Sequence, residues 1–137
     1  MFFNKKEDNN HVSDFVKIGA LLIHTAKIDE NYSKEEEEII KKTLLSLGAD
    51  KNNLETLIAK AKQCEEDANQ ILDFTKEIKN LKEIDKIKII KSLWEIIYSN
   101  KDADVYETNL MRRLAGLLYI DSKIMGDIKE QIKKENL

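Results

Sequence analysis

The sequence contains no proline and only four glycines in 137 residues. Both residues interrupt helices, so their scarcity favours long helices joined by few sharp turns. No segment shows a sustained alternation of apolar and polar residues, and we therefore expect no β-sheet. The fold class predicted from these absences is all-α.

Long apolar runs are also missing. The longest, IGALLI and LAGLLYI, fall far short of the ~20 residues that a membrane-spanning helix needs. The first ten residues, MFFNKKEDNN, lack the apolar core of a signal peptide. We therefore expect a cytoplasmic protein that does not span a membrane.

The chain also lacks a large excess of charge of either sign. The 23 basic and 26 acidic residues give a formal net charge of −3 and are well mixed, with no polybasic run. This balance argues against nucleic acid as a partner. Cys64 is the only cysteine, so no internal disulfide can form, and its place on an apolar helical stripe predicts packing.

Helical periodicity, in contrast, runs through nearly the whole chain. The length suits one domain, which we place over residues 1–137 with residues 1–11 as a flexible N-terminus. Short connections between the apolar segments favour antiparallel neighbours, so we predict a compact bundle of about seven helices. The predicted helices are residues 14–27, 34–47, a third from about 50, 69–81, 83–98, 105–118 and a last one from 121 or 122.

Two helix–loop–helix segments of the chain resemble each other. A shift of 71 residues places Leu22 on Leu93, Glu36 on Glu107 and Leu47 on Leu118. Most of the matched positions are similar in kind rather than identical. We predict that the bundle is built from two pseudo-symmetric helical hairpins, related by a pseudo-twofold axis, each with an acidic connection.

The acidic connections, KIDENYSKEEEEII and SNKDADVYETNLM, have a purely structural interpretation. Ser33 with Glu36, and Asp104 with Glu107, have the spacing of a capping box. In that motif the first side chain accepts a backbone N–H from the first helical turn, and the glutamate accepts the N–H of the cap residue. Capping explains these four residues without any ligand.

A cation site is the alternative interpretation of the same connections. Calcium, magnesium and manganese prefer oxygen ligands, whereas thiolates and imidazoles suit zinc. The EF-hand pattern fails, because Lys34 and Ile40 stand where that motif has its glycine and its last glutamate. A site would need ligands from another element. The alternating oxygen donors are Asp29, Asn31 and Ser33 in the first connection and Asn100, Asp102 and Asp104 in the second.

Residues suited to catalysis are scarce. His11 and His24 are the only histidines, and both the Glu-x-x-His signature of di-iron bundles and a glycine-rich phosphate loop are absent. His24 lies near the first acidic connection and could ligate or titrate there, although structural histidines are more common. We predict no enzymatic activity. A metal-dependent enzyme using His24, Asp29 and Glu36 is kept as an alternative.

Together the two hairpins resemble the TerB family, a tellurite-resistance-associated helical domain. Each half of that family has approximately the pattern of an apolar helix, Ala-x-x-Asp-Gly-x-φ-x-x-x-Glu, and a second apolar helix ending in Leu-Gly. The second half here, LWEIIYSNKDADVYETNLMRRLAGLLYI, is close to the family's Trp-Glu and Glu-x-x-φ-x-Arg-φ-Ala-x-Leu-Leu pattern. The first half ends in LLSLG and has the residues Ala26, Asp29, Tyr32 and Glu36.

The resemblance, over about residues 12–134, implies a seven-helix domain whose acidic residues chelate a divalent cation. It also implies a stress response to tellurite, other toxic agents and phage, with a protein partner that could lie at the inner face of the membrane. By position, the implied ligands are Asp29, Glu36, Glu95 and Glu107. Weaker candidates are His24, Asn31, Asn100, Asp102 and Asp104.

This chain departs from the family pattern at both turns. Glu30 and Lys101 stand where the family has glycine, so neither turn has the freedom of glycine at positive φ. Asn100 replaces the second aspartate, which weakens cation binding there. The function we predict is a non-catalytic binding or scaffold module of a tellurite-resistance-type system that binds calcium, magnesium or manganese. A metal-free protein–protein interaction module is the first alternative.

Overall fold

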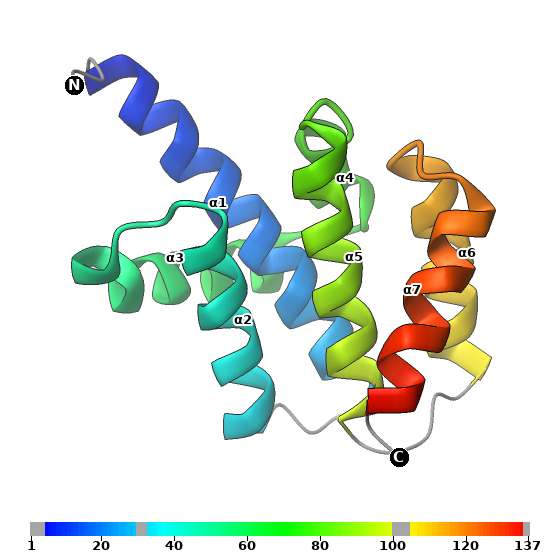
Figure 1. Ribbon diagram of the computed structural model, residues 1–137. Coiled ribbons are helices and arrows are strands. Elements are labelled where there is room, and N and C mark those ends of the chain that lie inside the picture. Colours follow the sequence, from blue (N-terminus) through cyan, green and yellow to red (C-terminus); the bar gives the residue numbers. More distant parts are fainter. Residues whose placement is uncertain (1–4, 30–32, 100–104, 136–137) are drawn as a thin grey trace.

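The computed structural model describes residues 5–29, 33–99 and 105–135, and it confirms the all-α prediction (Figure 1). Within these ranges there are seven α-helices, two short 3-10 helices and no strand. Side chains are described except those of residues 5–13, 29, 77 and 105–107. The helices are α1 Lys5–Ala26, η1 Lys27–Asp29, α2 Lys34–Ser46, η2 Lys51–Asn53, α3 Leu54–Asp67, α4 Leu72–Ile78, α5 Glu83–Tyr98, α6 Val105–Leu117 and α7 Ser122–Glu135.

The start of α1 differs from the prediction. The helix begins at Lys5, whereas the apolar pattern placed its start near Asp14. Its first turns lie in KKEDNNHV, which carries no apolar stripe that periodicity could detect. Residues 5–11, expected to belong to a flexible N-terminus, are helical; their flexibility stays a prediction.

The central helix of the bundle is α1, because α2, α3, α4 and α5 all pack against it. The helix α5 connects the two halves: it contacts α1, α2 and α7, while α6 contacts α4 and α7 (Figure 1). Buried apolar side chains from all seven α-helices form one core cluster, which includes the large rings of Phe74 and Trp94. The arrangement agrees with the predicted bundle.

The 71-residue repeat is visible where α2 and α6 end. The shift superimposes Gly48 on Tyr119. Their φ values are 111° and 57°, and within the described ranges these two residues alone have positive φ. In both turns the residue after the one with positive φ donates its N–H to the carbonyl five residues earlier, as in a Schellman motif. These bonds are Ala49 N–H to Leu44 O and Ile120 N–H to Ala115 O, each 2.9 Å.

The repeat also extends into α3 and α7, beyond the two hairpins predicted. Asp50 and Asp121 each accept a backbone N–H two residues later, at 3.0 and 2.7 Å. Three buried positions of α3 then superimpose on three buried positions of α7, so the repeated unit is a set of three helices. These positions are Leu54, Leu57 and Ala61 in α3 and Met125, Ile128 and Ile132 in α7.

Candidate functional site

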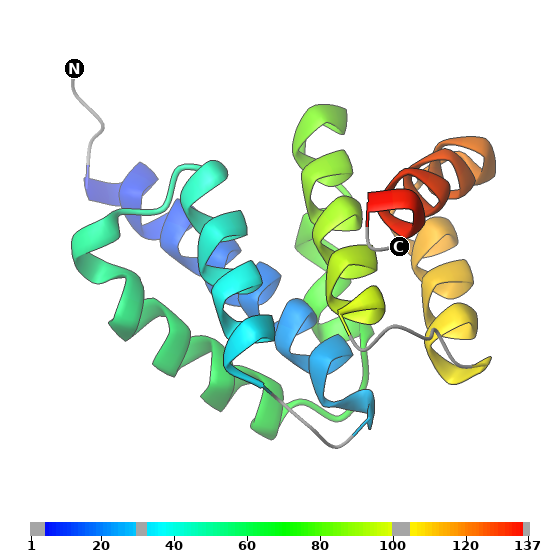
Figure 2. The same ribbon diagram turned by 60° about the horizontal axis from the view of Figure 1, so that its bottom comes forward.

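The helix ends that flank both acidic connections lie at one end of the molecule. The helices α1 and α5 finish there, and α2 and α6 begin there (Figures 1 and 2). The carboxyl ends of α1 and α5 favour a cation through the helix dipole, while α2 and α6 present their positive ends. Residues 30–32 and 100–104 lie outside the described part, and with them the candidates Asn31, Asn100, Asp102 and Asp104.

Glu36 forms the capping box predicted for the first connection. Its buried carboxylate accepts the Ser33 N–H at 2.9 Å, and Ser33 Oγ accepts the Glu36 N–H at 3.1 Å. One oxygen of Glu36 is therefore engaged by the start of α2. The structural interpretation is confirmed here, whereas the Asp104–Glu107 pair falls outside the described side chains.

Asp29 and Glu107 are placed by their backbones only. Asp29 is the last residue of η1, directly after α1, and Glu107 lies in the first turn of α6. Both positions belong to the end of the molecule where the acidic connections meet the helices (Figure 1). Their role as cation ligands stays a prediction.

Glu95 is the described carboxylate that best fits a cation ligand. It lies near the end of α5, is half-buried, and its side chain has no hydrogen bond or ion pair within the described ranges. Burial raises the pKa of Glu95 and Glu135 adds to the rise, while Lys91 and Lys42 oppose it. A desolvated carboxylate gains from a positive charge, and a hard divalent cation supplies two.

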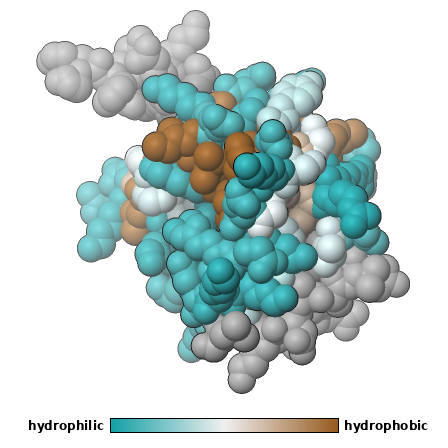
Figure 3. All heavy atoms as spheres, turned by 45° about the vertical axis from the view of Figure 1, so that its right-hand side comes forward, coloured by the Kyte–Doolittle hydropathy of each residue, from teal (hydrophilic) through white to brown (hydrophobic). Residues whose placement is uncertain are grey.

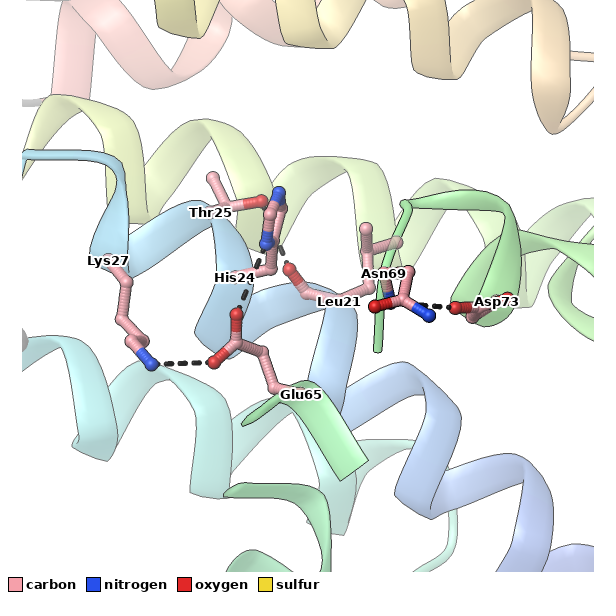
Figure 4. A network of polar contacts seen from close by, with 7 residues as sticks. All are labelled: Leu21, His24, Thr25, Lys27, Glu65, Asn69 and Asp73. Atoms are coloured by element: carbon pink, nitrogen blue, oxygen red, sulfur yellow. Dashed lines mark hydrogen bonds and ion pairs between the residues drawn. The ribbon is translucent and has the colours of Figure 1, made fainter. Parts of the chain in front are cut away.

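His24, a weaker candidate ligand, pairs with a glutamate of α3 that was not among the candidate ligands. Its Nδ1 lies 3.2 Å from Glu65 Oε2 on α3, and Lys27 Nζ lies 2.6 Å from Glu65 Oε1 (Figure 4). Burial is the largest single effect on Glu65 and opposes its ionisation, but hydrogen bonds from Lys27 and His24 outweigh burial and lower its pKa. The three residues fasten the end of α1 to α3.

Sequence reasoning missed Glu65, because 41 residues separate it from His24. Its position in AKQCEED carries no local motif that would reveal a partner on another helix. The contact follows only from the packing of α1 on α3. His24 therefore has a structural role in the described geometry.

The described side chains alone do not complete a metal site. Among them, no three or more His, Cys, Asp or Glu residues gather where they could hold an ion. A full ligand shell would need donors from the acidic connections together with Asp29 and Glu107. That donor set consists of carboxylate and carboxamide oxygens, which fits calcium, magnesium or manganese.

Trp94 and Tyr98 pack in the core. Their rings stack with centroids 5.9 Å apart and an interplanar angle of 24°. Lys129 Nζ lies 5.5 Å from the Trp94 ring centroid. Trp94 Nε1 is buried without a hydrogen-bond partner in the part of the chain that the structure describes. This donor would suit an oxygen acceptor rather than a cation.

A groove of about 620 Å³ runs beside Cys64. Two lysines and two aspartates, Lys17, Lys76, Asp67 and Asp73, lie on its walls, so its charges are balanced and favour neither sign of ligand. Cys64 itself is half-buried and packs against the core, as its apolar stripe predicted.

Comparisons with known proteins agree with the resemblance seen in the hairpins. Residues 16–130 match a protein-family model described as tellurite resistance protein TerB. The match takes in most of the chain and both acidic connections. No curated protein and no solved structure matches the chain. Among the described residues, no helix has both the length and the apolar character needed to cross a bilayer.

Proposed function

The chain belongs to the TerB family of tellurite resistance proteins, and from this premise we propose that it is a non-catalytic binding module of a tellurite-resistance-type stress response. Its acidic end binds a divalent cation, and the domain docks onto a protein partner in the cytoplasm. That partner could lie at the inner face of the membrane.

The observation that supports cation binding best is the position of Glu95. This half-buried carboxylate has no partner within the described ranges, and it lies near the carboxyl end of α5, at the end of the bundle that the two acidic connections share (Figure 1). Burying an unpaired charge costs free energy that a bound cation would offset.

In this proposal, Asp29 and Glu36 from the first repeat, with Glu95 and Glu107 from the second, hold the ion. The cation supplies two positive charges that relieve the mutual repulsion of these carboxylates. The ion would therefore join the two repeats.

Calorimetric titration with calcium, magnesium, manganese and zinc tests the proposal. We expect binding of at least one of the first three ions, with stabilisation of about 2.7 kcal/mol when the ion is at 100 times its Kd. Glu95→Gln should weaken binding at least about tenfold by removing a charged ligand. Asp127→Asn, an exposed carboxylate on α7, is the matched control and should leave affinity unchanged.

A second pair of variants separates ligation from capping. Glu36→Gln keeps a residue that the capping box accepts but removes the charge, whereas Ser33→Ala removes the cap and keeps the charge. We expect the first to lose cation affinity at nearly unchanged stability. The second should lose about 1 kcal/mol of stability and keep its cation affinity. The reverse pattern would show that Glu36 serves the fold only.

A metal-free protein-interaction module is the second candidate. The capping box favours it, because Ser33 and Glu36 already have backbone partners. This candidate predicts no heat and no thermal shift with any of the four ions. Such a result would retire the cation and leave partner binding as the function.

A further inference from the structure

The turn between α6 and α7 holds a strained residue that packing does not explain. Tyr119 has φ 57°, a left-handed conformation that costs free energy for any residue with a Cβ. Its side chain is 72% exposed, so burial of the ring does not offset that cost. The equivalent position of the first repeat is Gly48, which avoids the strain. Strain of this kind is a common mark of a functional position.

Two ammonium groups converge on the exposed Tyr119 ring. Lys86 Nζ, from α5, lies 5.8 Å from the ring centroid, and Lys79 Nζ, just after α4, lies 6.0 Å from it. Both distances are at the outer limit of about 6 Å for a cation–π contact. The α4–α5 region therefore meets the distant turn between α6 and α7 at this one exposed ring.

Neither ammonium group has a carboxylate within ion-pair distance in the described part of the chain. Lys86 is nevertheless buried, with only 8% of the residue exposed. Other lysines of the chain, such as Lys27 and Lys41, do have glutamate partners. Since a buried charge is costly without a counter-charge, the ring with its two lysines lacks a negative group.

Apolar side chains are exposed at the same end of the molecule. Ile84, in the first turn of α5 and two residues before Lys86, is 63% exposed. Figure 3 shows hydrophobic side chains gathered in its upper part, at the end where α5 begins and α6 ends, within a mostly hydrophilic face. A positive rim beside exposed apolar and aromatic groups is typical of a protein-binding surface.

We propose that Tyr119, Lys79 and Lys86 form a docking surface for an acidic segment of a partner protein. Carboxylates of that segment supply the counter-charge that both lysines lack, and the tyrosine ring offers a rigid amphipathic contact. The surface lies at the other end of α6 from the acidic connections (Figure 1). The proposal rests on the partner-binding role above but not on the cation, so the two can fail separately.

Charge complementarity selects this occupant over a membrane or a nucleic acid. Recruitment to anionic lipid takes clusters of about 4–8 basic residues, whereas two ammonium groups meet here. The chain carries a net charge of −3, which disfavours long-range attraction to a polyanion. A short acidic protein segment needs only local complementarity.

The test is an NMR titration of the full chain with an acetylated, amidated hexaglutamate peptide at 50 mM salt. We expect chemical-shift changes centred on residues 79–86 and 117–121, and we expect them to fade at 500 mM salt. Lys86→Gln and Tyr119→Gly should each weaken binding about fivefold, the change that one lost ion pair or cation–π contact produces.

Tyr119→Gly is chosen because glycine adopts the left-handed turn without strain, so the variant keeps its fold, which a thermal melt checks. Lys60→Gln, an exposed lysine on α3, is the matched control and should bind the peptide like the wild type. Shift changes centred elsewhere, or equal weakening by Lys60→Gln, would overturn the proposal. So would binding of phosphatidylserine vesicles through these residues without binding of the peptide.

Discussion

Glu65 shows how one carboxylate can fasten two helices that the sequence does not connect. Its carboxylate lies within ion-pair distance of both His24 and Lys27, and only 11% of its side chain is exposed. Because its pKa is lower in the folded chain than the ordinary 4.5, its charge stabilises the fold above that pH. The contribution is lost as the pH falls through the lower folded pKa.

The lowered pKa of Glu65 determines how the stability of the Glu65→Gln variant should depend on pH. At pH 7 the variant should be less stable than the wild type by about 1 kcal/mol, since Lys27 is largely exposed and the pair is screened by solvent. The difference in stability between the two proteins should shrink as the pH falls below the ordinary pKa of 4.5. Protonation of Glu65 then removes from the wild type the charge that the variant already lacks. Urea unfolding at a series of pH values on both sides of that ordinary pKa measures the difference.

Glu66→Gln is the control for this measurement, since Glu66 is the exposed neighbour on α3. A stability difference that did not change with pH, or one that the Glu66 variant shared, would contradict the role assigned to Glu65.

Gly48 and Tyr119 offer a second comparison at single residues. Gly48→Ala should destabilise the fold by about 1 kcal/mol or more, because alanine is strained at a φ of 111°. Tyr119→Gly should change stability by less than about 1 kcal/mol, since relief of strain offsets the added backbone entropy and the lost cation–π contacts. Thermal melts of both variants provide the test. A large loss for Tyr119→Gly would mean that the ring serves the fold rather than a partner.

At the scale of elements, α1 and α3 approach each other closely through small residues. A Cβ added at Gly19 would lie only 2.9 Å from the Cβ of Ala61. Contacts this short force one of the helices to move, because neither methyl group can rotate away. The glycine in α1 is thus explained by helix packing rather than by a turn.

Gly19→Ala should therefore destabilise the fold, although alanine favours a helix over glycine by about 1 kcal/mol. We expect overpacking of about 1–3 kcal/mol to outweigh that gain. Gly126→Ala in α7, where nothing lies within 4 Å of the added Cβ, should instead stabilise the fold by up to about 1 kcal/mol. Chemical denaturation of both variants gives the comparison. Equal stabilisation by both would show that α1 and α3 are not in close contact.

Ala61→Gly in the Gly19→Ala background makes the test specific to this contact. Removing the Ala61 methyl group should recover part of the stability lost through Gly19→Ala, with a coupling of about 1 kcal/mol. Additive effects of the two changes would contradict a direct contact between these residues.

Local patterns predicted the elements where the cause of the element is local. Apolar stripes placed α5 correctly at both ends, and the Ser33–Glu36 spacing predicted the capping box that starts α2. The polar start of α1 was missed, because no stripe marks it. The helix α4 is shorter than predicted. It begins at Leu72, and Asp73 in its first turn accepts the Asn69 N–H at 3.2 Å.

Long-range contacts could not be predicted in the same way. Two glutamates of α2 each have a lysine four residues later. Glu37 lies 3.8 Å from Lys41, but Lys41 lies closer to Glu55 of α3, at 2.9 Å. The other pair, Glu38 and Lys42, is not within ion-pair distance. Exposed side chains have several partners within reach, and the packing of other helices selects among them.

At the scale of the whole molecule, the repeat produces two ends with different chemistry. Both acidic connections meet helices at one end, while the Schellman-type turns after α2 and α6 lie toward the other ends of these helices. The helix α6, with 13 residues, separates Glu107 from Tyr119 by about 20 Å. A cation at one end and a protein segment at the other could therefore bind independently.

The candidate site was only partly predictable for a physical reason. Family position and oxygen spacing pointed to Asp29, Glu36, Glu95 and Glu107 together, but sequence spacing cannot show which carboxylates have other partners. The structure adds that Glu36 caps α2 and that Glu95 lacks a partner within the described ranges. Burial and competition for hydrogen bonds are properties of the packed chain, not of the motif.

The most direct test of the central claim is an NMR spectrum recorded with a small fraction of Mn²⁺, a paramagnetic ion that suits the proposed oxygen ligands. We predict that amide signals of residues 27–34 and 95–105, which belong to different repeats, broaden together, while signals around Tyr119 keep their intensity. Broadening confined to one repeat, spread evenly over the protein, or absent altogether would contradict a cation site shared by the two acidic connections.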